Sequence, residues 1–195
     1  MIVTTALLLL LLAGGPDPAG RPEALMGVAA VDGVPIVEQE LRFALPPGAA
    51  SGALHPATRD SARAAVRVAL DRAVDAKVRL LLAVEAGFLP GADYGAFLRA
   101  WESENASREL RKQAGETVYG PLRWSERAFY EYRLASIGIA LAGRARISPP
   151  AGAPGAGAAG DLPAALLRSR RAAASISVDE PALERFTDAL LEEQP

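Results

Sequence analysis

Cysteine is absent from this chain of 195 residues, and histidine occurs once, as His55. Without cysteine there is no disulfide framework, thiol nucleophile, iron–sulfur centre or cysteine-ligated zinc site. A single histidine likewise excludes histidine-clustered metal sites and mechanisms that use two histidines. We interpret His55 as a loop residue before a helix, because it lacks the residue types that would complete a catalytic constellation. The sequence therefore predicts no metal, no cofactor and no catalytic residue.

A surplus of positive charge is also missing. Lysine and arginine together number 21 against 23 acidic residues, which gives a formal net charge of −2. Sequence-independent binding to nucleic acid depends on a large basic surplus, so we expect no nucleic-acid partner. Half of the residues are hydrophobic, which argues against general disorder, and the length allows one ordinary domain with tails.

The N-terminal apolar run, residues 2–13, is shorter than the roughly 20 residues that a membrane-spanning helix needs. Its length and the small residues after it favour the hydrophobic region and cleavage zone of a secretory signal peptide. We therefore expect residues 1–20 to be a signal peptide and the protein to be exported, periplasmic or extracellular, with no stable membrane span. The signal is atypical because its first five residues carry no Lys or Arg. The alternative is an uncleaved hydrophobic tail or a buried N-terminal helix.

Helical periodicity dominates the chain from residue 37 onward, after one short extended segment. In that segment, Asp32-Gly33 between two apolar runs predicts a tight β-hairpin turn, and Pro35 restricts its strand to a sheet edge. Apolar residues then recur at helical spacing, with Gly87 as a left-handed cap of the longest helix. The expected helices cover residues 37–45, 58–86, 93–112 and 126–146. The predicted fold class is mainly α, with long helices and a short N-terminal β-hairpin.

The C-terminal region is divided by composition. Residues 148–160 contain only Ser, Pro, Gly and Ala, which predicts a flexible linker between a domain at 27–147 and a helical segment at 161–195. Arg168, Arg170 and Arg171 lie at the C-terminal end of the first expected helix, 161–174, where they suit the helix dipole. The sequence Ser177 to Glu180 predicts a capping box that opens the last helix.

Charged residues occupy every fourth position of the long helix, and we call these six residues the α-helical charge stripe: Arg59, Arg63, Arg67, Asp71, Asp75 and Arg79. Arg59, Arg63 and Arg67 allow an anion-binding patch. A solvated face is favoured, because acidic residues continue the stripe. Two pairs within the helix, Arg67 with Asp71 and Asp75 with Arg79, have the spacing for ion pairs.

The ordered motifs resemble the N-terminal domain of SurA/PrsA-type extracytoplasmic chaperones, over residues 27–147 and more weakly over 175–191. The blocks that carry the resemblance are Val28-Ala-Ala-Val-Asp-Gly-Val-Pro-Ile36, then Glu85-Ala-Gly-Phe88, a middle block from Tyr94 to Arg108, Val118-Tyr-Gly-Pro121, Phe129-Tyr130, and Ser177 to Phe186. Asp32 stands where the family has Asn, and Val37 where it has a Ser or Thr cap. The family's parvulin isomerase domain has no counterpart, since only 49 residues follow Arg146 and none is His or Cys.

The resemblance implies a peptide-binding domain, and eight of the eleven aromatic residues lie between Tyr94 and Tyr132. Aromatic side chains give large contact areas at low entropic cost. We expect the peptide-binding residues to be Tyr94, Trp101, Tyr119, Trp124, Tyr130 and Tyr132. The alternative, which we favour for Trp101 and its neighbours Phe97, Leu98 and Phe129, is a core between two helices. Glu104, Asn105 and Arg108 are predicted to form a structural polar network that holds the turn at 119–121.

Three functions remain compatible with these features. The first is an exported chaperone-like protein that binds unfolded or extended polypeptide without catalysis. The second is a peptidyl-prolyl isomerase, as family membership could suggest, although no catalytic domain is expected. The third is an envelope protein that docks to one specific partner through its C-terminal helix. The sequence does not reveal the client or the oligomeric state.

Overall fold

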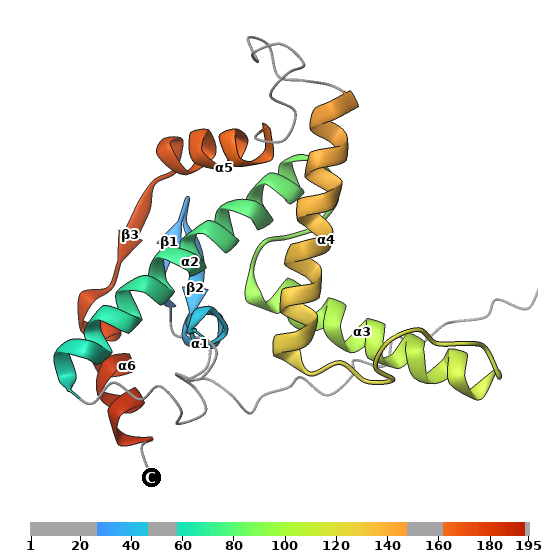
Figure 1. The fold of residues 1–195 in the computed structure, drawn as a ribbon, viewed down its shortest axis with the longest axis horizontal. Helices are drawn as coiled ribbons and strands as arrows, with labels where there is room; N and C mark the ends of the chain where they lie inside the picture. Colours follow the sequence, from blue (N-terminus) through green and yellow to red (C-terminus); the bar gives the residue numbers. More distant parts are fainter. Residues whose placement is uncertain (1–26, 47–57, 148–161, 194–195) are drawn as a thin grey trace, which may run out of the picture.

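The computed structural model describes residues 27–46, 58–147 and 162–193. Within these ranges the chain forms six helices and three strands, which confirms the predicted fold class, mainly α with an N-terminal hairpin (Figure 1). The expected signal peptide (1–20), His55 and the expected linker (148–160) lie outside the described residues.

The hairpin forms as the Asp-Gly turn predicts. Strands β1 (Gly27–Val31) and β2 (Val34–Val37) pair antiparallel, and both turn residues have positive φ, 50° at Asp32 and 79° at Gly33. Two consecutive positive φ values are typical of a type I′ turn, which glycine adopts without steric cost. β2 lies at the edge of the sheet, as Pro35 requires.

A third strand, which sequence reasoning missed, completes the sheet. β3 (Ile176–Val178) pairs antiparallel with β1, so the strand order is β2-β1-β3. The predicted capping box at Ser177 is wrong for the same reason, because Ser177 belongs to this strand. Asp179 is the N-cap of α6 (Glu180–Glu192) and its side chain accepts a hydrogen bond from the Ala182 backbone N–H at 3.0 Å.

Helix α1 (Glu38–Ala44) begins without a hydroxyl cap. The Glu40 carboxylate accepts a hydrogen bond from the Val37 backbone N–H at 3.2 Å, so one half of a capping box is present. This contact explains how the helix starts at Val37, which has no side-chain hydroxyl to act as a cap.

Helix α2 (Arg59–Glu85) is the central element and spans roughly 40 Å. The Thr58 side chain accepts the Ser61 N–H at its start, and Gly87 (φ 76°) reverses the chain at its end, where the Phe88 N–H donates to the Ala83 carbonyl oxygen. It contacts α1, α4, α5, α6 and two of the strands.

Two hydrophobic clusters follow one another along α2. The first joins the sheet, α1 and the N-terminal part of α2 to α6, which contributes Leu183, Phe186 and Leu190. The second joins the C-terminal part of α2 to α3 (Tyr94–Gln113) and α4 (Glu126–Ile147) through Phe97, Phe129 and Tyr130. The C-terminal segment therefore shares a core with the N-terminal hairpin.

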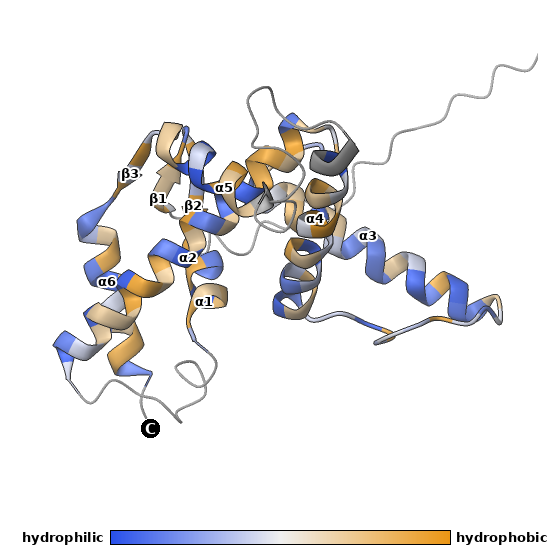
Figure 2. Ribbon diagram, turned by 45° about the horizontal axis from the view of Figure 1, so that its top comes forward, coloured by the Kyte–Doolittle hydropathy of each residue, from blue (hydrophilic) through white to orange (hydrophobic). Residues whose placement is uncertain are grey.

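Helix α3 starts in the second cluster and projects away from the body, and the connection 114–125 returns along it to α4 (Figures 1 and 2). On the other side of α4, helix α5 (Leu162–Ala173) lies across α2 and contacts both helices. The three helices α2, α4 and α5 thus surround a common surface region.

Candidate functional site

The predicted peptide-binding aromatics separate into buried and accessible residues. Tyr94 and Tyr130 are each only 5% exposed and pack against Phe97, with ring centroids 5.3 and 5.4 Å apart. Burial raises the pKa of the Tyr130 hydroxyl well above its ordinary value. These two tyrosines are core residues, so we correct their assignment: they present almost no surface to a peptide.

The other four predicted aromatics lie nearer the surface. The Trp101 indole N–H donates to the Trp124 carbonyl oxygen at 2.8 Å, and Trp124 stacks on Tyr132 with centroids 5.0 Å apart. Both tryptophans are half-buried, whereas Tyr132 is 53% and Tyr119 84% exposed. Tyr132 and Tyr119 therefore offer the largest accessible aromatic surfaces of the six.

The residues of the predicted polar network bind the connection 114–125 to α3. Asn105 exchanges two hydrogen bonds with the Trp124 backbone, at 2.8 and 3.1 Å. The Arg108 guanidinium donates to the carbonyl oxygens of Tyr119 and Pro121, both at 2.9 Å, and to the Glu104 carboxylate at 2.8 Å. These hydrogen bonds hold both ends of the turn in place. They are accounted for by a structural role.

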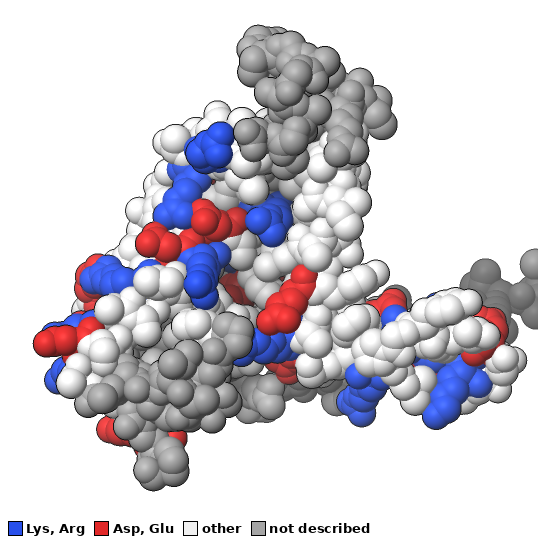
Figure 3. Space-filling view, viewed as in Figure 1, with Lys and Arg blue, Asp and Glu red and all other residues white. Residues whose placement is uncertain are grey.

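A separate apolar groove, which sequence reasoning did not locate, lies between α2, α4 and α5. Its volume is about 360 Å³, within the range of roughly 300–1,000 Å³ typical of ligand sites. The lining is apolar except for one charged residue; it comprises Arg79 and Leu82 of α2, Leu134, Ala135, Gly138, Ile139, Leu141 and Ala142 of α4, and Leu166 and Leu167 of α5. Figure 3 shows the upper part of α4 as an uncharged surface beside the charged cluster of α2 and α5.

Two residues of α4 define the shape of this groove. Ile139 is 75% exposed, an unusual position for a large β-branched apolar side chain. Gly138 leaves open space, because a Cβ atom added there would meet no atom within 4 Å. The groove is therefore open to solvent on one side and widened where a side chain is missing.

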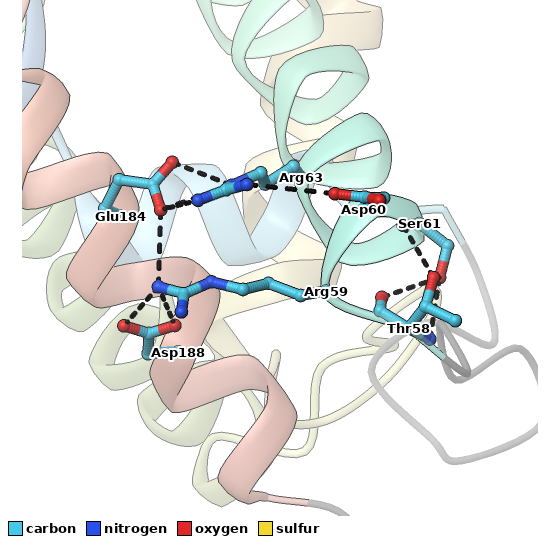
Figure 4. Close-up of polar contacts among 7 residues, drawn as sticks. All are labelled: Thr58, Arg59, Asp60, Ser61, Arg63, Glu184 and Asp188. Carbon is cyan, nitrogen blue, oxygen red and sulfur yellow. Dashed lines mark hydrogen bonds and ion pairs between the residues drawn. The ribbon is translucent and has the colours of Figure 1, made fainter.

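The charge stripe of α2 holds the C-terminal segment in place. Arg59, Arg63 and Arg67 form ion pairs with Asp188, Glu184 and Glu180 of α6 at 2.8, 2.9 and 2.5 Å, and Figure 4 shows the first two pairs. The acidic residues are also four apart, so the two antiparallel helices match charge by charge. The stripe is exposed to solvent, as we favoured, and its first three arginines also pair with acids of the chain itself.

Helix α5 pairs with the next part of the stripe. Arg171 binds the carboxylates of Asp71, at 2.8 Å, and Asp75, and Arg170 binds Asp32 and Glu85 at 2.7 and 2.9 Å. The predicted pairs within α2, Arg67 with Asp71 and Asp75 with Arg79, are replaced by these contacts between elements. Two guanidinium groups at the end of α5 thus fix one wall of the groove.

A buried ion pair joins α2 to α1. Lys77 and Glu40 side chains are each 1% exposed, with Nζ 2.7 and 2.9 Å from the two carboxylate oxygens. Burial raises the pKa of Glu40, and Lys77 acts in the opposite direction. Nζ also donates to the Ala92 carbonyl oxygen at 3.0 Å. The Lys77 ammonium group makes three hydrogen bonds and its side chain is buried. Its role is to hold α1 and α2 in position, and it is not accessible as a nucleophile.

Comparisons with family models, curated proteins and solved structures return no match for this chain. In the described part of the chain, no three or more acidic or histidine side chains gather as a metal site would need. Over the same residues, no helix has the length and apolar character to cross a membrane.

The sequence offered only partial signals for the groove. Leu134 and Leu141 follow the helical period of α4 and lie on one face of it. Ile139 and Gly138 lie off that face. An apolar residue such as Ile139, outside the apolar face of its helix, is the one available sequence signal for the groove. The wall formed by α5 could not be placed, since nothing in local sequence fixes how a segment beyond a linker docks.

Proposed function

We propose that this chain is an exported, chaperone-like protein that binds unfolded or extended polypeptide by apolar contact and carries out no catalysis. The groove between α2, α4 and α5 is the observation that carries the proposal. Non-native chains expose apolar side chains without a fixed arrangement, and an open apolar groove accepts them without demanding specific hydrogen bonds. The apolar segment at residues 2–13 supports export.

The accessible aromatics extend the proposed surface along α4. Tyr132 lies two turns before Ile139 on the same helix, and it stacks on Trp124 from the connection that folds back along α3. A polypeptide laid along α4 would meet the groove first and this aromatic pair next. We accordingly place the centre of binding in the groove and keep Tyr119, Trp124 and Tyr132 as its extension.

Docking to one partner through the C-terminal helix has less support. Helix α6 buries Leu183, Phe186 and Leu190 in the first core, and its acids pair with the arginines of α2. Both of its distinctive faces are therefore used within the chain. An isomerase function has no residue set to support it, and a proline-isomerisation assay on the purified protein is expected to show no rate enhancement.

The test is suppression of aggregation, measured by light scattering of an unfolded client with a several-fold excess of the purified protein. Gly138→Leu fills the groove at a position where the new side chain meets open space, and Leu also favours the helix more than Gly. Ile139→Asp places a charge at its edge. We expect the wild type to slow aggregation and both variants to lose most of this effect.

Gly143→Leu is the matched control. Gly143 lies in the same helix, also has room for a Cβ atom and does not line the groove. This variant should protect the client as well as the wild type does. Aggregation that proceeds unchanged in the presence of wild type, or equal protection by all three variants, contradicts the proposal.

A further inference from the structure

Arg79 is the one charged residue in the lining of the groove, and it is also the exception in the charge stripe. The other five members of the stripe each have a partner on α5 or α6. Among the residues that the structure describes, no carboxylate lies within ion-pair distance of Arg79. Arg79, a half-buried residue whose charge also acts on the Tyr130 hydroxyl, therefore lines an otherwise apolar groove without a carboxylate partner in the described ranges.

Acidic residues of α2 and α4 that the structure describes pair with other arginines. Asp75, four residues before it, binds Arg171, and Glu85 binds Arg170. Glu131 on α4 pairs with Arg127 at 3.0 Å. A charge that is partly removed from water interacts more strongly with an incoming opposite charge than a fully solvated one does. The positive end of the groove is thus available to an acidic ligand group.

We infer that the groove selects polypeptide segments in which an acidic side chain lies next to apolar residues. Arg79 would bind the carboxylate, and apolar side chains of the segment would pack on Leu82, Leu134 and Ile139. This inference rests on the proposed function and narrows its substrate class from any apolar segment to apolar segments with an acidic group. Arginine suits this task because its planar guanidinium binds a carboxylate through two hydrogen bonds.

The open side of the groove favours a polypeptide over a small amphiphile such as a fatty acid. Sites for small ligands typically cover about 70–90% of the ligand surface. Here Ile139 is 75% exposed, so an occupant would be covered on one side only. An extended chain, which continues beyond the groove in both directions and gains contacts there, fits that geometry.

The experiment measures binding of fluorescent peptides by anisotropy. Three peptides share one apolar sequence and differ at a single central position, which is Glu, Gln or Lys. We expect the wild type to bind the Glu peptide about tenfold more tightly than the Gln peptide, with the preference falling as salt rises. Arg79→Gln should bind the Glu and Gln peptides equally, and Arg79→Glu should prefer the Lys peptide.

Arg168→Gln is the control variant. Arg168 is exposed on α5, directly after the groove residue Leu167, and does not line the groove. It carries the same charge change as Arg79→Gln and should keep the preference for Glu.

The outcomes separate the inference from the proposed function. The wild type could bind the Glu and Gln peptides equally, and Gly138→Leu could lose this binding. That result overturns the inference and leaves the proposed function standing. Failure of every peptide to bind overturns both. Arg79-dependent binding of oleate or of anionic phosphatidylglycerol vesicles, without peptide binding, overturns the inference and assigns the site to lipid.

Discussion

Lys77 and Glu40 are charged residues at positions where the helices around them are apolar. Of the ion pairs in the described ranges, theirs is the one in which both side chains are 1% exposed. The desolvation of two buried charges is repaid only when their hydrogen bonds are complete. Glu40 also holds the first turn of α1, and Lys77 also binds the carbonyl of Ala92. The pair therefore joins α1, α2 and the approach to α3 at one point.

Lys77→Met should destabilise the protein by about 3–5 kcal/mol, because it leaves the Glu40 charge buried without a partner. The double variant Lys77→Met with Glu40→Gln should be more stable than Lys77→Met alone. Glutamine is neutral, and its side-chain oxygen still accepts the Val37 N–H. Urea unfolding of the wild type, both single variants and the double variant measures this coupling. If the two losses simply add, the buried charge is not the cause.

The stability of Lys77→Met should also depend on pH. Burial raises the pKa of Glu40 even beside Lys77, and loss of Lys77 raises it further. A carboxyl group whose pKa is higher in the folded state than in the unfolded state stabilises the fold at low pH and loses that contribution as pH rises. The deficit of Lys77→Met relative to wild type should therefore be smallest in acid and grow toward neutral pH. A constant deficit would contradict this explanation.

Single-residue roles were only partly predictable. The Asp-Gly turn was predicted because it depends on local chemistry, and the structure contains it. Lys77 could have been recognised as a lysine among apolar positions of α2, but its partner lies 37 residues away. Tyr94 and Tyr130 were misjudged because a polar hydroxyl at one end does not keep a tyrosine at the surface when helices pack around its ring.

Helices α2 and α6 are held together by matched spacing as well as by apolar packing. On α2, three arginines are spaced four residues apart, and on α6 three acids have the same spacing. The two sets face each other in antiparallel order. A shift of one helix by one turn would leave at least one charge unmatched. The apolar contacts of Leu183 and Phe186 supply stability, and the charges specify the register.

The ion pairs of the C-terminal segment should weaken in acid, when their carboxylates become protonated. Hydrogen bonds and charge from Arg63 lower the pKa of Glu184, Arg42 lowers that of Glu193, and the Ser175 backbone N–H with Arg170 lowers that of Asp32. A carboxylate with a lowered pKa stabilises the fold above its unfolded pKa of about 4 and loses this contribution as pH falls through the folded pKa.

Glu184→Gln tests this at the level of one helix. Urea unfolding should show a small loss of stability at pH 6 and no difference from wild type near pH 2, where both side chains are neutral. Glu192→Gln is the control, since Glu192 is exposed on α6 and makes no ion pair among the described residues. A loss that persists unchanged at low pH would mean that Glu184 acts through packing instead.

Element boundaries were predicted well where caps and glycines mark them. The expected helices at 58–86 and 93–112 correspond to α2 and α3, and the helix at 126–146 corresponds to α4. β3 was missed because the alternation Ile-Ser-Val is only three residues long, and pairing with β1 is what makes these residues a strand. The partners of the charge stripe were missed because local spacing cannot distinguish a partner one turn away from one on another helix.

The whole molecule depends on its C-terminal segment. Phe186 is 1% exposed in the core shared with the hairpin, and the Arg42 guanidinium lies 5.3 Å from the centre of its ring. Phe186→Ala should lower the free energy of unfolding by about 3–5 kcal/mol, because it removes a large buried side chain and leaves a cavity. Urea denaturation measures this loss in a single transition that involves both hairpin and helices.

The neighbouring residue provides the control for that measurement. Arg185 is exposed on the same helix, and Arg185→Ala should change stability by no more than about 0.5 kcal/mol. A Phe186→Ala protein as stable as Arg185→Ala would show that α6 is an appendage. At this scale the sequence indicated a mainly helical protein with a C-terminal helical segment, and it could not indicate that this segment completes the core.

The pairing of β1 with β3 also has a consequence for synthesis on the ribosome. The central strand ends at Val31 and its second neighbour begins at Ile176, so 145 positions separate them. At translation speeds of about 5–20 residues per second, the nascent strand waits on the order of ten to thirty seconds for that neighbour. During this interval one side of β1 is an open edge, at which a newly made chain is vulnerable to aggregation.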